Sequence, residues 1–322
     1  MPKSKIGDIH FGRVKVLKSQ YDSMYCIRTI CAYGNLIISG SYDDTIKIWD
    51  PYSGKCIREL VGHIDRIWCL AVQGNLLISG SEDNTIRIWD MNTWECIKTL
   101  KGHECCVNSI CVKDNLIISC SGDRTIRIWD IDSCQCIKTL ERHADCICIK
   151  DNLLISDSVE KHIIIWDIMS GEYIKQLKGH TDFINSLCLK GNLLVSGSCD
   201  DTIRIWDMTS WKCIRTLTGH IHKFITIINN LIFSISYDST IKILDITSGI
   251  CIKTLAGHAE DVFGICSSDN LIISGVYYNT IRITPITLCP GEYDKFSAVI
   301  AGYELVPYLE QQLMDCFKPD KD

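Results

Sequence analysis

The chain has 322 residues, of which 46% are hydrophobic and 22% are charged, and its formal net charge is −6. This composition is sufficient for a continuous buried core and does not indicate disorder. The negative charge and the lack of a Lys/Arg block exclude an electrostatic footprint for nucleic acid or anionic membrane. No apolar run is long enough for a signal peptide or a membrane span. We therefore expect a cytoplasmic protein, with the nucleus as the alternative location.

A 16-residue phrase that occurs seven times is the most regular feature of the chain, and it runs from NLIISGSYDDTIKIWD at 35–50 to NLIISGVYYNTIRITP at 270–285. Its terminal Trp, or the residue that replaces it, recurs after 40, 40, 37, 40, 38 and 40 residues. Such a constant period predicts small structural units that pack on their neighbours. The copies begin at Asn35, Asn75, Asn115, Asn152, Asn192, Asn230 and Asn270.

In chain order, the first predicted strand is 12–18 (GRVKVLK), which imitates the C-I-K-T-L segment that follows the later copies. Each repeat then contains an apolar strand such as 66–72, a Gly-Asn, Asp-Asn or Asn-Asn pair, and the buried strand L-I-I-S. These pairs accept positive φ and predict two-residue hairpin turns. A turn S-x-D, an alternating strand T-I-x-I-W and an outer strand such as 55–60 complete the repeat. The pattern therefore predicts four strands per unit.

Units of about forty residues with Gly-His and Trp-Asp signatures are typical of β-propeller blades. Over residues 12–290 the chain resembles the WD-repeat family, since Gly62-His63 precedes Trp89-Asp90 and two further copies keep the same spacing. The copies are most similar to those of F-box/WD-repeat substrate receptors, although the residues before the first strand are too few for an F-box. The fold expected is all-β, a seven-bladed propeller of four-stranded antiparallel blades in residues 1–302.

The chain ends are expected to close the ring, because the copies provide only six outer strands. Residues 12–18 and, less well, 292–301 imitate the missing strand, and we favour 12–18. Residues 303–322 form a C-terminal tail. Leucines four residues apart predict a short helix after Pro307, which packs on the propeller rim or docks in a partner's groove.

The resemblance implies a buried, hydrogen-bonded tetrad of His, Ser, Asp and Trp in three blades. A search for His, Ser and Asp would report a hydrolase triad there, but we interpret these residues as framework. This role takes the histidines at 63, 103, 143, 180, 220 and 258 and leaves three others, which no nucleophile elbow, phosphate loop or carboxylate pair accompanies. We expect no enzyme activity, catalytic residue or cofactor. The predicted tetrads are His63/Ser79/Asp83/Trp89, His103/Ser119/Asp123/Trp129 and His180/Ser196/Asp200/Trp206.

The other repeats depart from this pattern. The fourth copy is three residues short between His143 and Trp166, so its innermost strand or the preceding loop must be trimmed. We expect the weaker blades to exchange amide protons faster. The departures are Ser23 for His, Glu160 for Asp, His162 for Thr, Leu244 for Trp, and Tyr278 and Thr284 in the last copy.

Most of the 20 cysteines follow the repeat and are expected to be reduced, small apolar fillers of a protein in a reducing compartment. The pairs Cys134/Cys136 and Cys146/Cys148 lack the C-x2-C spacing of structural zinc sites. We therefore expect no metal site.

Residues that differ between copies are the candidates for partner binding, because the framework is shared and the loops at one end of a propeller determine which partner it binds. In the receptors that the copies resemble, phosphopeptide-reading arginines stand five residues after the blade His or one before the turn Asp. Only Arg28 is basic at the matching positions, and a phosphate clamp needs several guanidinium groups, so phosphodegron binding is disfavoured. The predicted partner-binding residues are Arg28, Tyr42, Trp68, Glu82, Tyr237, Phe263 and Tyr277.

Aromatic rings beside carboxylates suit a peptide that contains Lys or Arg, while the alternative is that the rings only fill the channel mouth. We expect a non-catalytic protein-interaction scaffold that binds peptide segments at the channel-mouth face as a monomeric propeller within a complex. The alternative is a substrate-recruiting component of a ubiquitin-ligase complex.

Overall fold

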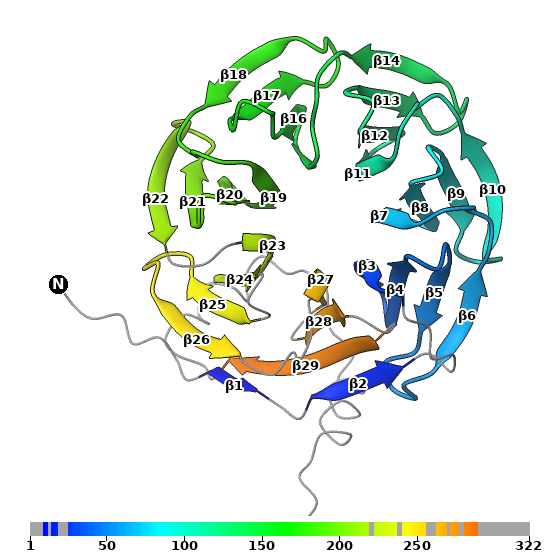
Figure 1. The fold of residues 1–322 in the computed structure, drawn as a ribbon, viewed down its shortest axis with the longest axis horizontal. Coiled ribbons are helices and arrows are strands. Elements are labelled where there is room, and N and C mark those ends of the chain that lie inside the picture. Colours follow the sequence, from blue (N-terminus) through cyan, green and yellow to red (C-terminus); the bar gives the residue numbers. More distant parts are fainter. Residues whose placement is uncertain are drawn as a thin grey trace, which may run out of the picture.

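The computed structural model describes residues 9–11, 14–18, 25–218, 222–236, 240–255, 262–268, 271–276 and 280–288. These residues form seven antiparallel sheets that stand around a common axis as the blades of a ring (Figure 1). The predicted all-β, seven-bladed propeller is therefore confirmed. The predicted C-terminal helix and the segment 292–301 lie outside the described residues.

The blades follow the repeats in order, each from its innermost to its outermost strand. Blade one contains β3 (Ile27–Tyr33), β4 (Leu36–Ser41), β5 (Ile46–Trp49) and β6 (Cys56–Leu60). Blade two contains β7 (Ile67–Gln73), β8 (Leu76–Ser81), β9 (Ile86–Asp90) and β10 (Glu95–Leu100). Blade three contains β11 (Val107–Lys113), β12 (Leu116–Ser121), β13 (Ile126–Asp130) and β14 (Cys136–Leu140).

The remaining blades continue around the ring. Blade four contains β15 (Ile147–Lys150), β16 (Leu153–Ser156), β17 (Ile163–Asp167) and β18 (Tyr173–Leu177). Blade five contains β19 (Ile184–Lys190), β20 (Leu193–Ser198), β21 (Thr202–Asp207) and β22 (Lys212–Thr218). Blade six contains β23 (His222–Ile228), β24 (Leu231–Ser236), β25 (Ile241–Asp245) and β26 (Cys251–Leu255). Blade seven contains β27 (Val262–Ser268), β28 (Leu271–Val276) and β29 (Thr280–Leu288).

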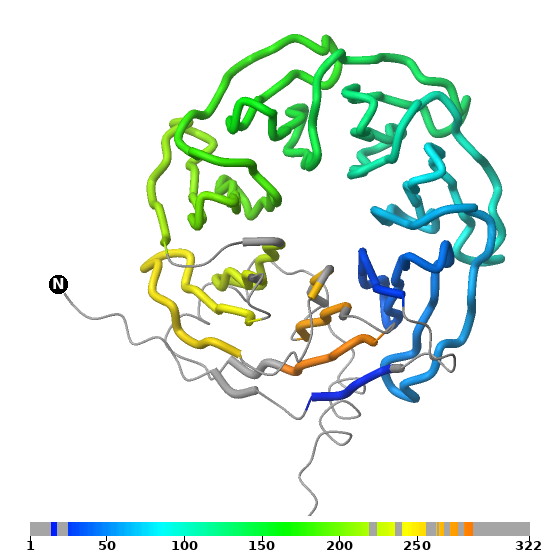
Figure 2. Tube along the Cα trace, viewed as in Figure 1, coloured from blue at the N-terminus to red at the C-terminus, as the bar shows by residue number. Residues whose placement is uncertain are grey.

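Two N-terminal strands form the outer edge of blade seven. β2 (Lys15–Lys18) pairs antiparallel with the first half of β29, from Lys15 opposite Ile283 to Lys18 opposite Thr280. β1 (Ile9–Phe11) pairs with the last three residues of the same strand. Figure 2 shows β2 lying beside β29, the last described strand of the chain. The outer strand of blade seven is thus divided into two pieces, both from the N-terminal side.

The turn between the first two strands of a blade requires the residues that the repeat provides. The first residue of the pair has φ between 50° and 56° in the six blades where it is described. Only Gly, Asn and Asp accept this left-handed conformation readily. The predicted two-residue hairpins are therefore confirmed in these blades. The six residues are Gly34, Gly74, Asp114, Asp151, Gly191 and Asn229.

Hydrophobic side chains are buried between neighbouring blades rather than within one blade. For example, Cys69 and Ile78 of blade two pack in one cluster with Ile117 and Trp129 of blade three. The innermost strands of neighbouring blades lie side by side around the whole ring. Each blade therefore needs both neighbours to complete its core.

The repeated cysteines pack as apolar residues, and every cysteine of the described residues is a free thiol. Burial raises the pKa of Cys31 and of Cys111 to about 12. Such thiols stay protonated and unreactive at neutral pH, in agreement with their predicted role as fillers.

Candidate partner-binding face at the channel mouth

The structure brings the four predicted residues of the blade-three tetrad into one hydrogen-bonded chain. Asp123 Oδ2 lies 2.7 Å from His103 Nδ1, and His103 Nε2 lies 2.7 Å from Ser119 Oγ. Trp129 Nε1 donates to the same hydroxyl oxygen at 2.9 Å. A carboxylate only accepts, so the imidazole donates from Nδ1 and accepts the Ser119 proton at Nε2. Each side chain of the tetrad therefore provides the hydrogen-bond partner that its neighbour needs.

Blades two and five repeat this arrangement. The His–Asp distances are 2.7 and 2.9 Å, and both His–Ser distances are 2.7 Å. The Trp indole donates to the Ser hydroxyl at 2.9 Å in both blades. The residues are His63, Ser79, Asp83 and Trp89 in blade two, and His180, Ser196, Asp200 and Trp206 in blade five.

The order Ser–His–Asp copies that of a hydrolase triad, but burial and charge fix it as framework. Ser119 is 0% exposed and already accepts the indole proton, so no substrate reaches its oxygen in the folded blade. Burial lowers the pKa of His103, although the Asp123 carboxylate opposes this shift. Burial alone would raise the pKa of Asp123, but hydrogen bonds from Thr125 and His103 lower it to about 2. A neutral imidazole and an ionised carboxylate result.

Blade four does not form the tetrad, and the expectation that His143 takes the framework role is wrong. Its Nδ1 atom is buried without a hydrogen-bond partner, and its Nε2 atom lies 3.9 Å from the carboxylate of Asp145. Ser156 accepts only the indole proton of Trp166, at 3.1 Å. Glu160, which replaces the turn Asp, is exposed. The side chains at 220 and 258 lie outside the described residues.

The innermost strand of blade four is trimmed, which is one of the two alternatives that the spacing left open, and a buried carboxylate compensates for the loss. β15 has four residues, whereas the innermost strands of blades two, three and five have seven. Asp157 Oδ1 accepts the backbone N–H groups of Asp145 and Cys146 at 2.8 and 2.9 Å. Burial raises the pKa of Asp157 to about 7 despite these hydrogen bonds. Sequence reasoning missed Asp157, and its signal was an acid after L-L-I-S in the most shortened repeat.

Four of the predicted partner-binding residues meet at one end of the ring, which we call the channel mouth. The guanidinium of Arg28 in blade one lies 4.7 Å from the ring centroid of Trp68 in blade two. On its other side it lies 4.9 Å from the ring of Phe224 in blade six. Because β27 stands between β3 and β23, the Arg28 side chain reaches past blade seven. It is therefore held between aromatic rings of two blades that are not neighbours.

A second arginine completes this cluster. The guanidinium of Arg66 lies 4.9 Å from the ring of Tyr42 and 3.5 Å from the carboxylate of Glu82. Glu82 also accepts the indole proton of Trp68 at 3.4 Å, and the Tyr42 and Trp68 rings stand 6.0 Å apart. The channel-mouth cluster thus consists of Arg28, Tyr42, Arg66, Trp68, Glu82 and Phe224.

The remaining predicted residues are not placed in this cluster. Tyr237 and Tyr277 lie outside the described residues, and Phe263 is described only as part of the backbone of β27. Sequence reasoning missed Arg66 and Phe224. Arg66 was visible as a basic residue three positions after the blade-two His. Phe224 follows the deletion in blade six, so only the strand pairing reveals its position.

A family model described as "WD domain, G-beta repeat" matches residues 12–50, 54–90, 94–130, 171–207, 211–245 and 249–284. These segments cover more than half of the chain. The chain belongs to the WD-repeat family. The longest internal stretch that the family model does not match is 131–170. It contains β15, β16 and β17 of blade four, in agreement with the broken tetrad of that WD-repeat blade. Propellers of this family generally serve as protein-interaction scaffolds.

Curated relatives resemble short parts of this WD-repeat chain. Cell division control protein 4 of Candida albicans is 37% identical over 70 residues, which are 18% of this chain and 10% of the relative. F-box/WD repeat-containing protein 7 of Drosophila melanogaster is 46% identical over 54 residues, which are 17% and 4%. A probable E3 ubiquitin ligase complex SCF subunit, sconB of Talaromyces stipitatus, is 40% identical over 35 residues, which are 11% and 5%. The matches therefore span a tenth of each relative or less.

Among solved structures, the computationally designed Ika8 protein has a TM-score of 0.67 and 26% sequence identity, over 84% of this chain and 99% of its own. In the described part of the WD-repeat chain, no helix is long and apolar enough to cross a membrane. The same residues contain no group of three or more His, Cys, Asp or Glu side chains that suits a metal ion.

Proposed function

We propose that the protein is an interaction scaffold that binds an extended segment of a partner protein across the channel mouth. The observation that carries this proposal is the stacking of Arg28 between Trp68 and Phe224. Arginine and aromatic residues dominate binding energies at protein interfaces. Here they come from three blades and are already held in place, so a partner loses less side-chain freedom when it binds.

The charge expected of the partner segment follows from the two arginines that already lie on the aromatic rings of the channel mouth. A partner Lys or Arg would have to displace Arg28 from Trp68 and Arg66 from Tyr42. An acidic or polar segment can instead contact the edges of both guanidinium groups without displacing them. The Arg28→Ala substitution separates the two chemistries. It strengthens capture of a Lys/Arg segment that uses the exposed ring, and it weakens capture of a segment that contacts the guanidinium group. We expect weaker capture.

The proposal is tested by affinity capture from cell extract, with quantitative comparison of the proteins retained. Trp68→Ala removes the central ring of the cluster, and Trp94→Ala is the matched control, because Trp94 is also half-buried but lies in the turn between β9 and β10 at the opposite end of the blade. We expect partners to be lost with Trp68→Ala and retained with Trp94→Ala at similar melting temperatures. Equal retention by both variants contradicts the proposal.

A second candidate function is recruitment of substrates to a ubiquitin ligase. It is favoured by relatives whose names include an F-box and an E3 ubiquitin ligase complex SCF subunit. If this chain acts in such a complex, cullin or F-box subunits co-purify with it under native conditions. Their absence from captures that retain other partners in a Trp68-dependent way favours a scaffold outside the ligase.

A further inference from the structure

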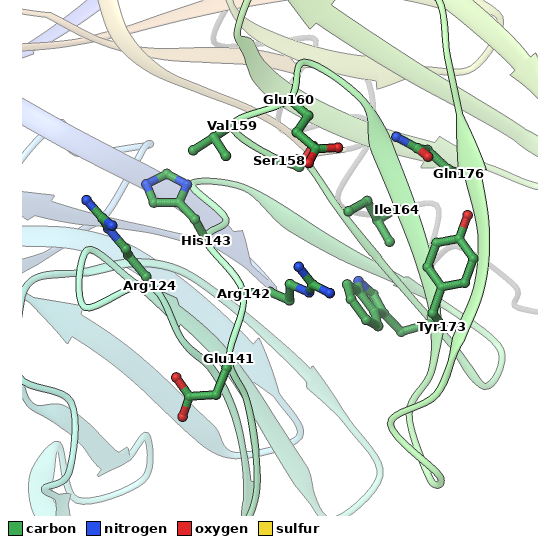
Figure 3. Close-up of a pocket in the computed structure, with 11 residues that line it drawn as sticks. Arg124, Glu141, Arg142, His143, Ser158, Val159, Glu160, Ile164, Tyr173 and Gln176 are labelled. Carbon is green, nitrogen blue, oxygen red and sulfur yellow. The ribbon is translucent and has the colours of Figure 1, made fainter.

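A pocket of about 490 Å³ opens beside the missing tetrad of blade four (Figure 3). Arg124 contributes from the turn between β12 and β13, and Arg142 and His143 contribute from the loop between β14 and β15. Ile164 and Trp166 of β17 form an apolar wall. The volume falls in the range of sites that take a small ligand or a few side chains.

The pocket exists because two residues of the blade pattern are exchanged together. In blade three, a Cβ atom on Gly102 would come within 3.0 Å of both Trp129 Cη2 and Arg127 Nη1, so a larger residue there would have to displace these side chains. Blade four has Arg142 in that position. Its backbone instead makes a tight turn in which Arg142 N donates to Leu140 O at 2.9 Å. This turn moves the next residue, His143, away from the tetrad.

The strand opposite this turn carries the second exchange. Blades two, three and five have an arginine two residues before the tetrad Trp, and its guanidinium lies against the Gly-His segment. Blade four has Ile164 there, a shorter side chain that leaves this space open. Figure 3 shows Arg142 pointing into the space toward the wall that carries Ile164 and Tyr173.

Within the described residues, the guanidinium groups of the pocket have no ion-pair partner, whereas His143 Nε2 lies 3.9 Å from the Asp145 carboxylate. Within the described part of the chain, neither Arg124 nor Arg142 forms an ion pair, and His143 Nδ1 is buried without a hydrogen bond. Figure 3 shows Glu141 pointing away from the other lining residues, so Glu160 is the acid that faces the pocket with them. Arg142 therefore points into the pocket as a cation without an ion pair.

We propose that this pocket binds a carboxylate from an acidic segment of a partner protein, held by Arg142 with its aliphatic part against Trp166. Arginine binds carboxylates through parallel hydrogen bonds, and these are stronger than neutral ones. The site is separate from the channel mouth, so it goes beyond the proposed function.

The test measures fluorescence anisotropy of a fluorescein-labelled hexaglutamate peptide with the full chain, and a hexaglutamine peptide of the same length is the uncharged comparison. Arg142→Glu reverses the charge at the centre of the pocket. The double variant Arg142→Gly/Ile164→Arg restores the glycine and the arginine that three intact blades carry at these positions, so the fold tolerates it and the pocket is filled. We expect both variants to weaken hexaglutamate binding at least about tenfold.

Arg58→Glu is the matched control, because Arg58 is an exposed residue of outer strand β6 in blade one. It changes the net charge as Arg142→Glu does, and we expect binding to stay within about twofold of the wild type. Trp68→Ala is likewise expected to leave hexaglutamate binding intact, which separates this site from the channel mouth. The proposal is overturned if hexaglutamate does not bind the wild type, if hexaglutamine binds equally well, or if the double variant Arg142→Gly/Ile164→Arg binds as the wild type does.

Discussion

Two serine-to-alanine substitutions at equivalent positions measure what a complete tetrad contributes to stability. Ser119 and Ser156 are both buried on the second strand of their blades, and both accept an indole proton. Ser119 also hydrogen-bonds to His103, whereas Ser156 has no such partner because His143 lies elsewhere. The substitutions remove the same hydroxyl from matched sites, so their difference reports the histidine contact alone.

The magnitude follows from the number of polar groups left unpaired. Each buried donor or acceptor without a partner costs about 1–3 kcal/mol. Ser119→Ala leaves two such groups, the indole N–H and the imidazole Nε2, and is expected to lower the free energy of unfolding by about 2–6 kcal/mol. Ser156→Ala leaves one, at a cost of about 1–3 kcal/mol.

Equilibrium unfolding in urea, followed by far-UV circular dichroism, provides the comparison. We expect the transition midpoint of Ser119→Ala to fall below that of Ser156→Ala, with unchanged slopes. If Ser156→Ala is as destabilising as Ser119→Ala, the tetrad histidine adds nothing to the buried Ser–Trp hydrogen bond, and the interpretation of the tetrads as a cooperative network is refuted.

Three further predictions concern pH and local stability. The folded pKa of Asp123, about 2, lies below its ordinary value of 3.8, so its contribution is present above pH 4 and is lost as the pH falls toward about 2; the stability difference between wild type and Asp123→Asn, measured in urea, should shrink over this window. Asp157 has the opposite sign, since its folded pKa is raised to about 7, and stability is lost as the pH rises through that value. Asp157→Asn should therefore raise the melting temperature more at pH 8 than at pH 5, and an equal effect at both contradicts this. Amide protons of β15 and β16 should exchange faster than those of β11 and β12 in hydrogen-exchange mass spectrometry, and uniform protection would be inconsistent with a weakened blade four.

Most of the fold could be predicted because each repeat carries its own local signals. The Gly-Asn and Asp-Asn pairs specify left-handed turn residues, and the shortening after His143 indicates a trimmed innermost strand or a trimmed preceding loop. The division of the outer strand of blade seven could not be predicted, because 12–18 matches the outer-strand pattern but Ile9–Phe11 does not. Pairing of that segment depends on the extra length of β29 rather than on its own sequence.

The candidate sites were less predictable because they depend on distances across the ring. Alignment of the copies indicated that Arg28 and Trp68 share one end of their blades. It could not show that Arg28 reaches Phe224, since this contact depends on how closely non-neighbouring blades approach the axis. The pocket in blade four follows from Arg142 and Ile164 together, and neither exchange alone predicts it. Each departure from the repeat was visible in the sequence, whereas the pocket that they form together could be seen only from the packing of the blade.

The pairing of β2 with β29 also determines when the ring can close during synthesis of the protein. A strand that ends at Lys18 must wait for a partner that ends at Leu288, so the ring stays open until nearly all blades have left the ribosome. At roughly 5–20 residues per second, this wait lasts roughly 15 to 50 seconds. During it, β2 has an unpaired edge, and its lysines at both ends discourage pairing with other nascent chains. Strand β2 therefore has to avoid pairing with other chains until β29 is available.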